Sequence, residues 1–175
     1  YLSKTIWMNL KELSRNYYFD FLIIFFIFGL DRISKIYIIY LSEKNLTLKL
    51  FSSKFLNIKL IWNEGIAFGL FSFNRTDLYN FLTIIILVVI LVIFIMVIKN
   101  TGLKKYSLIM ILGGAIGNLY DRVFFRAVPD FIDFHIGEFH WFVFNIADIF
   151  ITLGVIFMIL LELIDNNKNK DYEKN

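Results

Sequence analysis

The chain has 175 residues, of which 58% are hydrophobic and 19% are charged, and its formal net charge is +3. This composition is too apolar for an ordinary soluble domain and predicts a single polytopic membrane domain over residues 1–175. The small positive excess indicates membrane topology and argues against nucleic-acid binding. The absence of cysteine excludes disulfides, thiolate metal sites and a cysteine nucleophile.

Four apolar runs, each close to the length that a bilayer core requires, predict four transmembrane helices. They cover about residues 17–41, 81–98, 106–125 and 142–164. The first run is interrupted by Asp31, Arg32 and Lys35, whereas the second carries no charge at all. The sequence therefore predicts an all-α membrane protein built on a four-transmembrane-helix bundle.

The connecting segments predict the orientation of this bundle. Outer loops are expected at 42–79 and 126–141, with polar tails at 1–16 and 165–175, the second of which is expected to be disordered. The tails and the 99–105 turn carry nine Lys and Arg residues, against six in the two outer loops. The positive-inside rule then predicts that both termini are cytoplasmic.

The first outer loop contains a pattern that differs from the helical runs. Apolar residues alternate with others at Leu46, Leu48 and Leu50, and again at Leu56, Ile58 and Leu60. This period of two predicts short strands.

Polar residues scattered along the chain are predicted to converge near the outer face of the membrane. They are Asp31, Lys35, Asn63, Asn118, Asp121, Arg122, Asp130, Asn145 and Asp148, and Gly65 is expected at the same depth. An ionisable side chain near the bilayer core is energetically costly, so such a cluster is a functional hypothesis by default. Asp31 and Lys35 are four residues apart on one helix face, and they either belong to this site or merely neutralise each other.

The third span carries two further spacings. Gly113 and Gly117 form a small-xxx-small step, which predicts close packing between helices. Asn118 and Arg122 are four residues apart and share one helix face, which is expected to look into the bundle or a hydrated cleft.

The chemistry that this cluster can perform is limited by what the sequence lacks. It contains no G-x-S-x-G nucleophile elbow, no H-E-x-x-H zinc pattern and no phosphate-binding loop. His135 and His140 are predicted to be interfacial loop residues and not metal ligands. Two carboxylates held close together share a proton, so one can activate water while the other protonates a carbonyl oxygen.

Such aspartic-protease chemistry requires no cofactor. The residues alone do not decide which two of the four aspartates Asp121, Asp130, Asp133 and Asp148 would form the pair. Asp130, expected in a flexible loop, and Asp148, expected on a helix, are a plausible couple.

Five segments in this order resemble the motifs of the lipoprotein signal peptidase family, also called signal peptidase II. They are DRISK (31–35), NEGIAFG (63–69), GGAIGNLYDR (113–122), VPDFIDF (128–134) and FNIADIFITLG (144–154). The resemblance implies an aspartic endopeptidase of the bacterial cytoplasmic (inner) membrane. Such an enzyme removes signal peptides from diacylglyceryl-modified prolipoproteins and cuts just before the lipidated cysteine.

The resemblance also assigns roles to residues. Asp130 and Asp148 would be the catalytic dyad, Asp121 a supporting structural residue, and Asp133 a loop carboxylate. Pocket-shaping or substrate-binding residues would be Asp31, Lys35, Asn63, Gly65, Gly114, Asn118, Arg122 and Asn145. Segment 42–79 would form a small extracytoplasmic β-sheet, or cradle, and 126–141 a short extracytoplasmic loop. The expected partners are the prolipoprotein and membrane lipids, with the enzyme a monomer without metal or cofactor.

Three residues depart from the family pattern. Arg32 stands where Gln is usual, Phe142 stands where Pro is usual, and Pro129 directly precedes Asp130. Pro129 fixes its own φ and restricts Val128 to extended geometry, so it is expected to stiffen the loop that presents Asp130.

Two other functions remain open from the residues. A proton-coupled membrane transporter would also use intramembrane Asp, Lys and Arg, but its polar groups should line a path across the membrane. Here they cluster near one face. A non-catalytic membrane scaffold would not explain why carboxylates are retained.

Overall fold

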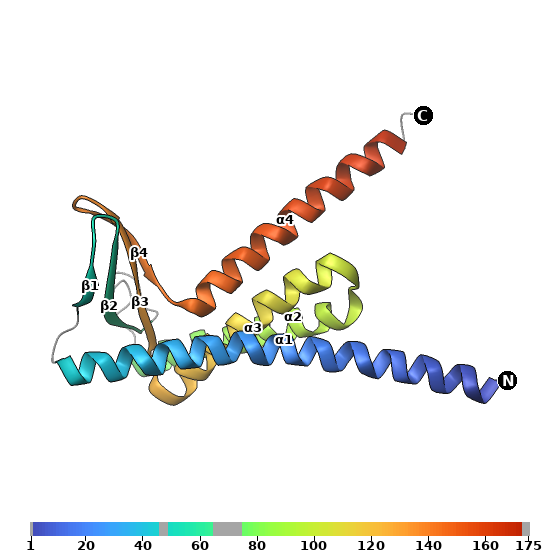
Figure 1. Cartoon of the computed structure of the whole chain (residues 1–175), viewed down its shortest axis with the longest axis horizontal. Helices are drawn as coiled ribbons and strands as arrows, with labels where there is room; N and C mark the ends of the chain where they lie inside the picture. Colours follow the sequence, from blue (N-terminus) through green and yellow to red (C-terminus); the bar gives the residue numbers. More distant parts are fainter. Residues whose placement is uncertain (1, 46–48, 65–74, 173–175) are drawn as a thin grey trace.

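The computed structural model describes residues 2–45, 49–64 and 75–172, and these residues form four helices and four strands (Figure 1). The helices are α1 (Leu2–Asn45), α2 (Arg75–Lys99), α3 (Gly102–Phe125) and α4 (Ile146–Tyr172). The strands are β1 (Lys49–Ser52), β2 (Leu56–Asn63), β3 (Val128–Ile136) and β4 (Phe139–Phe144). The protein is thus mostly helical, with one small sheet.

Helix α3 is the centre of the bundle, because it packs against α1, α2 and α4. Its buried residues Leu108, Ile109 and Leu112 form an apolar core with Ile90 and Val97 of α2. Toward its C-terminal end the buried residues of α3 become glycines and polar side chains, including Asn118 and Asp121. The same helix therefore supplies both the apolar core and part of the polar cluster.

Three of the helices are long and apolar enough to cross a membrane, which agrees with three of the four predicted spans. They are Asp77–Lys99 in α2, Gly102–Phe125 in α3 and Ile146–Asp165 in α4. Helix α1 is longer still, but Asp31, Arg32 and Lys35 interrupt its apolar sequence.

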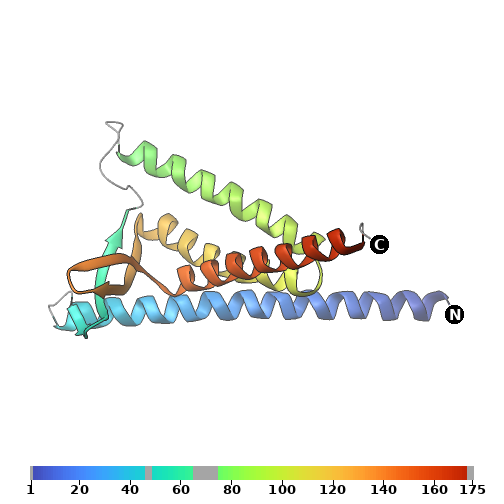
Figure 2. The same ribbon diagram turned by 90° about the horizontal axis from the view of Figure 1, so that it is seen from above.

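The ends of the helices fall into two groups. The sheet and the start of α4 lie at one end of the bundle, beside the C-terminal part of α1 (Figures 1 and 2). The N-terminal part of α1, the connection between α2 and α3, and the C-terminal part of α4 lie toward the other end. The chain thus places its basic segments on the side away from the sheet.

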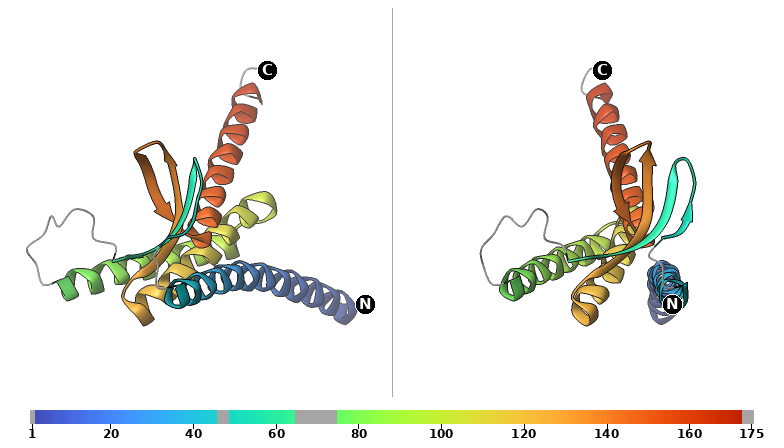
Figure 3. Two further views of the ribbon diagram at one scale, coloured as in Figure 1. Left: turned by 60° about the vertical axis from the view of Figure 1, so that its left-hand side comes forward. Right: turned by 90° about the vertical axis from the view of Figure 1, so that its left-hand side faces the viewer.

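The prediction of a loop over 126–141 is wrong, because most of these residues belong to β3 and β4. The sheet is antiparallel in the order β1-β2-β3-β4 and stands at one end of the bundle (Figure 3). Strand β3 pairs with β2 from Val128 to Phe134 and with β4 from Ile132 to Ile136, and this pairing provides partners for many of its backbone polar groups. Gly137, whose φ is +60°, closes the tight turn between β3 and β4.

The predicted strands of the first outer loop are confirmed where the structure describes them. Strand β2 covers the alternating segment at Leu56, Ile58 and Leu60, and Leu50 lies in β1. Residues 46–48 lie outside the described residues.

Several predicted boundaries need correction. Residues 142–144 belong to β4 and not to the fourth span, since the helix begins only after Asn145. Helix α2 begins at Arg75, before the expected residue 81. The tails 2–16 and 165–172 continue α1 and α4 as helix, because extending an existing helix is far easier than nucleating one.

Candidate active site

The two predicted dyad residues, Asp130 and Asp148, share Asn145 as a hydrogen-bond partner. Asp130 lies on β3 and Asp148 in the first turn of α4. The Asn145 side-chain Nδ2 donates to Asp130 Oδ1 at 2.6 Å, and its backbone N donates to Asp148 Oδ2 at 3.1 Å. Residues from a strand and a helix are thus brought to one position.

Each carboxylate also accepts a hydrogen bond from a second amide side chain. Asn63, the last residue of β2, donates to Asp130 Oδ2 at 2.9 Å. Asn118 of α3 donates to Asp148 Oδ1 at 2.8 Å. All three of the predicted amide residues, from β2, α3 and the start of α4, therefore orient the two carboxylates.

The carboxyl group of Asp130 has a strongly perturbed pKa. Burial raises the pKa of Asp130 to about 6, and the negative charge of Asp148 acts in the same direction. The hydrogen bonds from Asn63 and Asn145 act in the opposite direction and do not cancel the effect of burial. A carboxyl group that titrates near neutral pH is suited to general acid–base chemistry.

A cluster of four charged residues lies next to these carboxylates and joins α1 to α3. Lys35 Nζ lies 2.9 Å from the Asp31 carboxylate and 2.6 Å from Asp121 Oδ2. Arg32 reaches the same two aspartates, at 2.8 Å to Asp31 and 2.5 Å to Asp121. Two positive and two negative charges thus compensate one another, as buried ions require, since Asp31, Lys35 and Asp121 are buried and Arg32 is partly buried.

The charged cluster is linked to the dyad by two hydrogen bonds. Lys35 Nζ donates to Asn118 Oδ1 at 3.0 Å, and the same Asn118 side chain holds Asp148. Asp31 Oδ1 accepts a bond from the backbone N of Ala147 at 3.1 Å, at the start of α4. Of the two interpretations of Asp31 and Lys35, the geometry therefore favours membership of the site over a simple neutralising pair.

The glycines of α3 allow α1 and α4 to approach it closely. A Cβ on Gly114 would run into the carbonyl oxygen of Ala147, and one on Gly117 would come within 2.7 Å of Asp31 Oδ2. A Cβ on Gly113 would lie 3.0 Å from Ile27. The prediction of close packing at Gly113 and Gly117 is confirmed.

The remaining predicted residues are placed as follows. Arg122 Nη1 donates to the backbone oxygen of Asn118 at 3.1 Å, and its buried Nε has no hydrogen-bond partner among the described residues. Gly65 lies outside the described residues. In the part of the chain that the structure covers, no group of His, Asp and Glu is arranged to hold a metal ion.

The structural position of Arg32 is not predicted by the sequence, in which this residue stands out only as a departure from the family pattern. The Arg32 guanidinium also lies 4.8 Å from the ring centre of Tyr120 and so packs between α1 and α3. A signal was available, because pairing Asp31 with Lys35 leaves Arg32 and Asp121 as uncompensated charges in apolar sequence.

The interpretation of Asp133 as a loop carboxylate is wrong. Asp133 is fully buried on β3, where Lys59 Nζ lies 2.7 Å from Oδ2 and His140 Nδ1 lies 2.9 Å from both oxygens. Burial acts to raise the pKa of Asp133, but hydrogen bonds from Lys59, His140 and Asn57 outweigh it and lower this pKa to about 2. Asp133 therefore belongs to the structure of the sheet.

Comparisons with known proteins identify the family of this chain. A family model described as "Signal peptidase (SPase) II" matches residues 23–164. The lipoprotein signal peptidase of Pelagibacter ubique (strain HTCC1062) is 50% identical over 168 residues, covering 96% of this chain and 98% of its own length. That of Anaplasma phagocytophilum (strain HZ) is 37% identical over 139 residues, covering 78% and 86%.

A solved structure of a bacterial membrane enzyme is also similar to this chain. It superposes with a TM-score of 0.64 at 31% identity, covering 85% of this chain and 90% of that one. Together with the three apolar helices, this likeness identifies a multi-pass membrane protein. The named relatives are peptidases, which disfavours the transporter alternative. The chain therefore belongs to the signal peptidase II family of membrane proteases.

Proposed function

We propose that this protein is an aspartic endopeptidase that removes signal peptides from diacylglyceryl-modified prolipoproteins and cuts just before the lipidated cysteine. The observation that carries the proposal is the position of Asp130 and Asp148. Two carboxylates from separate elements are oriented by Asn145, and each also accepts a bond from another amide. The family to which the chain belongs supports the choice of substrate.

In the proposed mechanism the dyad activates one water molecule. Asp148, which is only partly buried, takes a proton from the water as its oxygen attacks the scissile carbonyl carbon. Asp130, which is 3% exposed and has a raised pKa, starts in its protonated form and donates its carboxyl proton to the carbonyl oxygen. When the intermediate collapses and the C–N bond breaks, the proton on Asp148 passes to the leaving amine. One hydroxyl of the intermediate returns its proton to Asp130, which restores the starting state of the dyad.

The substrate backbone would be held by residues around the dyad. A peptide that enters an apolar site needs partners for its N–H and C=O groups. We infer that Arg122, whose Nε is buried without a partner among the described residues, donates to a substrate carbonyl. Asn63, which is exposed on one side and bonded to Asp130 on the other, would contact the peptide next to the scissile bond.

The same proposal includes a topology. Helix α1 would be the fourth span, since its charges Asp31, Arg32 and Lys35 are paired within the protein and do not face lipid as free ions. The sheet would rest at the outer face of the bacterial cytoplasmic membrane as a cradle, with both termini in the cytoplasm. The enzyme would act as a monomer without a cofactor.

The proposal is tested by cleavage of a synthetic diacylglyceryl-modified prolipoprotein with purified protein in detergent. Asp130→Asn and Asp148→Asn should each reduce the rate by about 10²- to 10⁴-fold or more, as expected when an acid–base group is lost. Asp77→Asn, which alters an exposed carboxylate in the first turn of α2, is the matched control and should retain full activity. Normal cleavage by either dyad variant would overturn the assignment.

A further inference from the structure

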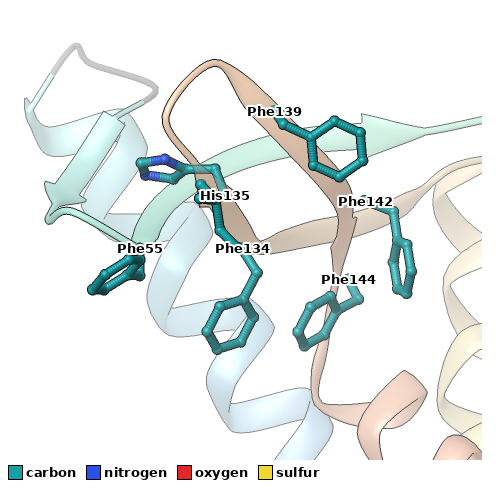
Figure 4. Close-up of a pocket in the computed structure, with 7 residues that line it drawn as sticks. Phe55, Phe134, His135, Phe139, Phe142 and Phe144 are labelled. Atoms are coloured by element: carbon teal, nitrogen blue, oxygen red, sulfur yellow. The ribbon is translucent and has the colours of Figure 1, made fainter.

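A polar hollow lies at the end of the bundle away from the sheet. The hollow beside the sheet, of about 420 Å³, is by contrast almost wholly apolar, and Figure 4 shows its phenylalanine side chains gathered mainly along β3 and β4. The polar hollow has a volume of about 300 Å³, at the lower end of the range for small-molecule sites. It is lined by α1 and by the start of α3, through Phe19, Asp20, Thr101, Gly102, Lys105 and Tyr106.

An ion pair between Asp20 of α1 and Lys105 of α3 forms part of the wall of this polar hollow. The side chain of Asp20 is 9% exposed and that of Lys105 is 14% exposed. Asp20 Oδ2 is buried and, among the described residues, has this ion pair but no directed hydrogen bond. Because a carboxylate can accept about four hydrogen bonds, Asp20 retains the capacity to accept from a cationic group in the hollow.

The start of α3 offers the opposite charge to a ligand. Thr101 precedes the helix in extended geometry, and within the described residues its side chain makes no capping hydrogen bond. The first turn of α3 has no acidic residue, so the N–H groups and partial positive charge of the helix N-terminus are not compensated there. A Cβ on Gly102 would meet no described atom within 4 Å, which leaves the approach open. These N–H groups, the Thr101 hydroxyl and Lys105 are suited to a phosphate group.

The hollow lies at the level where the apolar spans end. The span in α2 ends at Lys99, and the span in α3 begins at Gly102. Tyr106, in the wall of the hollow, is 46% exposed, and so is Tyr17, whose ring centre lies 5.3 Å from Lys105 Nζ. Tyrosine is enriched at the level of the lipid headgroups. The hollow is therefore placed where the phosphate and amine groups of phospholipids are abundant.

We propose that this hollow binds the headgroup of a zwitterionic aminophospholipid, with the phosphate at the start of α3 and the primary ammonium at Asp20. The two charges of such a headgroup match the two ends of the hollow in sign. An anionic glycerol headgroup would bring no cation to Asp20, and a quaternary ammonium would bring a charge without an N–H donor. The bound lipid would hold α1 against α3 at this end of the bundle. The inference does not depend on the proposed function, because none of these residues belongs to the candidate active site.

The test measures the binding of single lipids to delipidated protein in detergent by native mass spectrometry. Three phospholipids with identical acyl chains carry an ethanolamine, a choline or a glycerol headgroup. Wild-type protein should bind the ethanolamine lipid with an apparent Kd roughly tenfold lower than the other two, as expected for one hydrogen bond to a charged group. Soluble phosphoethanolamine should bind far more weakly than the lipid. Equally tight binding of phosphoethanolamine would overturn the lipid assignment and indicate a soluble ligand.

Variants separate the two halves of the site. Asp20→Asn should abolish the preference for ethanolamine over choline, and Lys105→Gln should weaken the binding of all three lipids. Asp20→Lys combined with Lys105→Asp keeps an ion pair between the helices and should also lose the preference. Lys104→Gln is the matched control, because Lys104 pairs with Glu162 and Asp165 and does not line the hollow, and it should bind like wild type.

Prolipoprotein cleavage by each variant reports folding and tests the proposed function separately. Equal affinity of the wild type for the three lipids would overturn the site, and so would an unchanged ethanolamine preference in Asp20→Asn. The second result would show that the Asp20–Lys105 pair only clamps α1 to α3. Tighter binding of the glycerol lipid than of the ethanolamine lipid would overturn the assignment of the ammonium to Asp20 and indicate a simple anion site.

Discussion

Asn145 and Asp148 cap each other at the start of α4. The backbone N of Asp148 donates to Asn145 Oδ1 at 3.1 Å, and the backbone N of Asn145 donates to Asp148 Oδ2 at 3.1 Å. This reciprocal arrangement is a capping box, which satisfies two backbone donors that a helix N-terminus otherwise leaves unpaired. The predicted catalytic carboxylate therefore also determines where its own helix begins.

The dual role of Asp148 predicts different effects for two substitutions that both abolish cleavage. Asp148→Ala removes the acceptor for the Asn145 backbone N and should lower the free energy of unfolding by about 1 kcal/mol. Asp148→Asn retains a side-chain oxygen and should lose less. Thermal unfolding in detergent would measure the difference, and equal stability of the two variants would show that the cap contributes nothing.

The raised pKa of Asp130 predicts that stability falls between acidic and neutral pH. The folded protein binds this proton more tightly than the unfolded chain, with a pKa of about 6 against 3.8. The stabilising contribution is therefore fully present below pH 4 and is lost as the pH rises through 6. The shift corresponds to roughly 3 kcal/mol.

Denaturation of the wild type and of Asp130→Asn at pH 4 and pH 7.5 would measure this contribution. The variant cannot ionise at this position, so it should gain stability relative to wild type as the pH rises. Parallel pH profiles of the two proteins would contradict the assignment.

The position of Arg32 in the charged cluster leads us to expect that Arg32→Gln, which introduces the residue usual in the family, lowers the stability of the fold. Arg32→Gln would leave Asp31 and Asp121 with Lys35 as their one partner in the charged cluster. Removing one member of a buried ion pair is strongly destabilising, here by roughly 3 kcal/mol. Thermal unfolding would show this as a lowered Tm.

Lys104→Gln is the control for Arg32→Gln, since Lys104 pairs with Glu162 and Asp165 on the surface. Exposed ion pairs contribute little, so this variant should unfold near the wild-type temperature. If both variants lost the same stability, the importance assigned to the buried cluster would be wrong.

The close contact between Gly114 of α3 and the start of α4 predicts that a side chain at this position reduces activity. The added Cβ of Gly114→Ala would meet the carbonyl oxygen of Ala147, a backbone atom that cannot move away alone. The start of α4 would shift, and cleavage should fall at least about 10²-fold, as when a reacting group is misplaced by about 1 Å. Gly29→Ala, which meets nothing within 4 Å, should keep full activity and gain up to about 1 kcal/mol of helix stability.

The sequence predicts the fold correctly where a single local pattern, such as an apolar run or a helical spacing, determines the structure. The uninterrupted apolar run at 81–98 predicted α2, because no other structure buries such a segment in a bilayer. The four-residue spacing of Asp31 and Lys35 predicted their pairing. Both features depend on local sequence alone.

The parts that sequence reasoning missed depend on contacts between distant segments. Strand β3 carries Pro129, Asp130 and Asp133, residues that are uncommon in strands. It forms because β2 pairs with it along most of its length and β4 pairs with it from Ile132 onward. Its apolar and polar residues do not alternate, since Val128 to Phe131 are all buried. By contrast, the N-x-x-D spacing at Asn145 was a readable signal for the start of α4, and apolar content alone placed that start too early.

The hydrogen bond from the Ala147 backbone to Asp31 joins residues that are 116 positions apart in the chain. During translation Asp31 emerges from the ribosome long before Ala147, so this contact can form only after Ala147 has also emerged. The predicted dyad has the same timing, because Asp148 directly follows Ala147 in the chain. A nascent chain that has not yet exposed the start of α4 therefore lacks both the Ala147–Asp31 contact and one member of the predicted dyad.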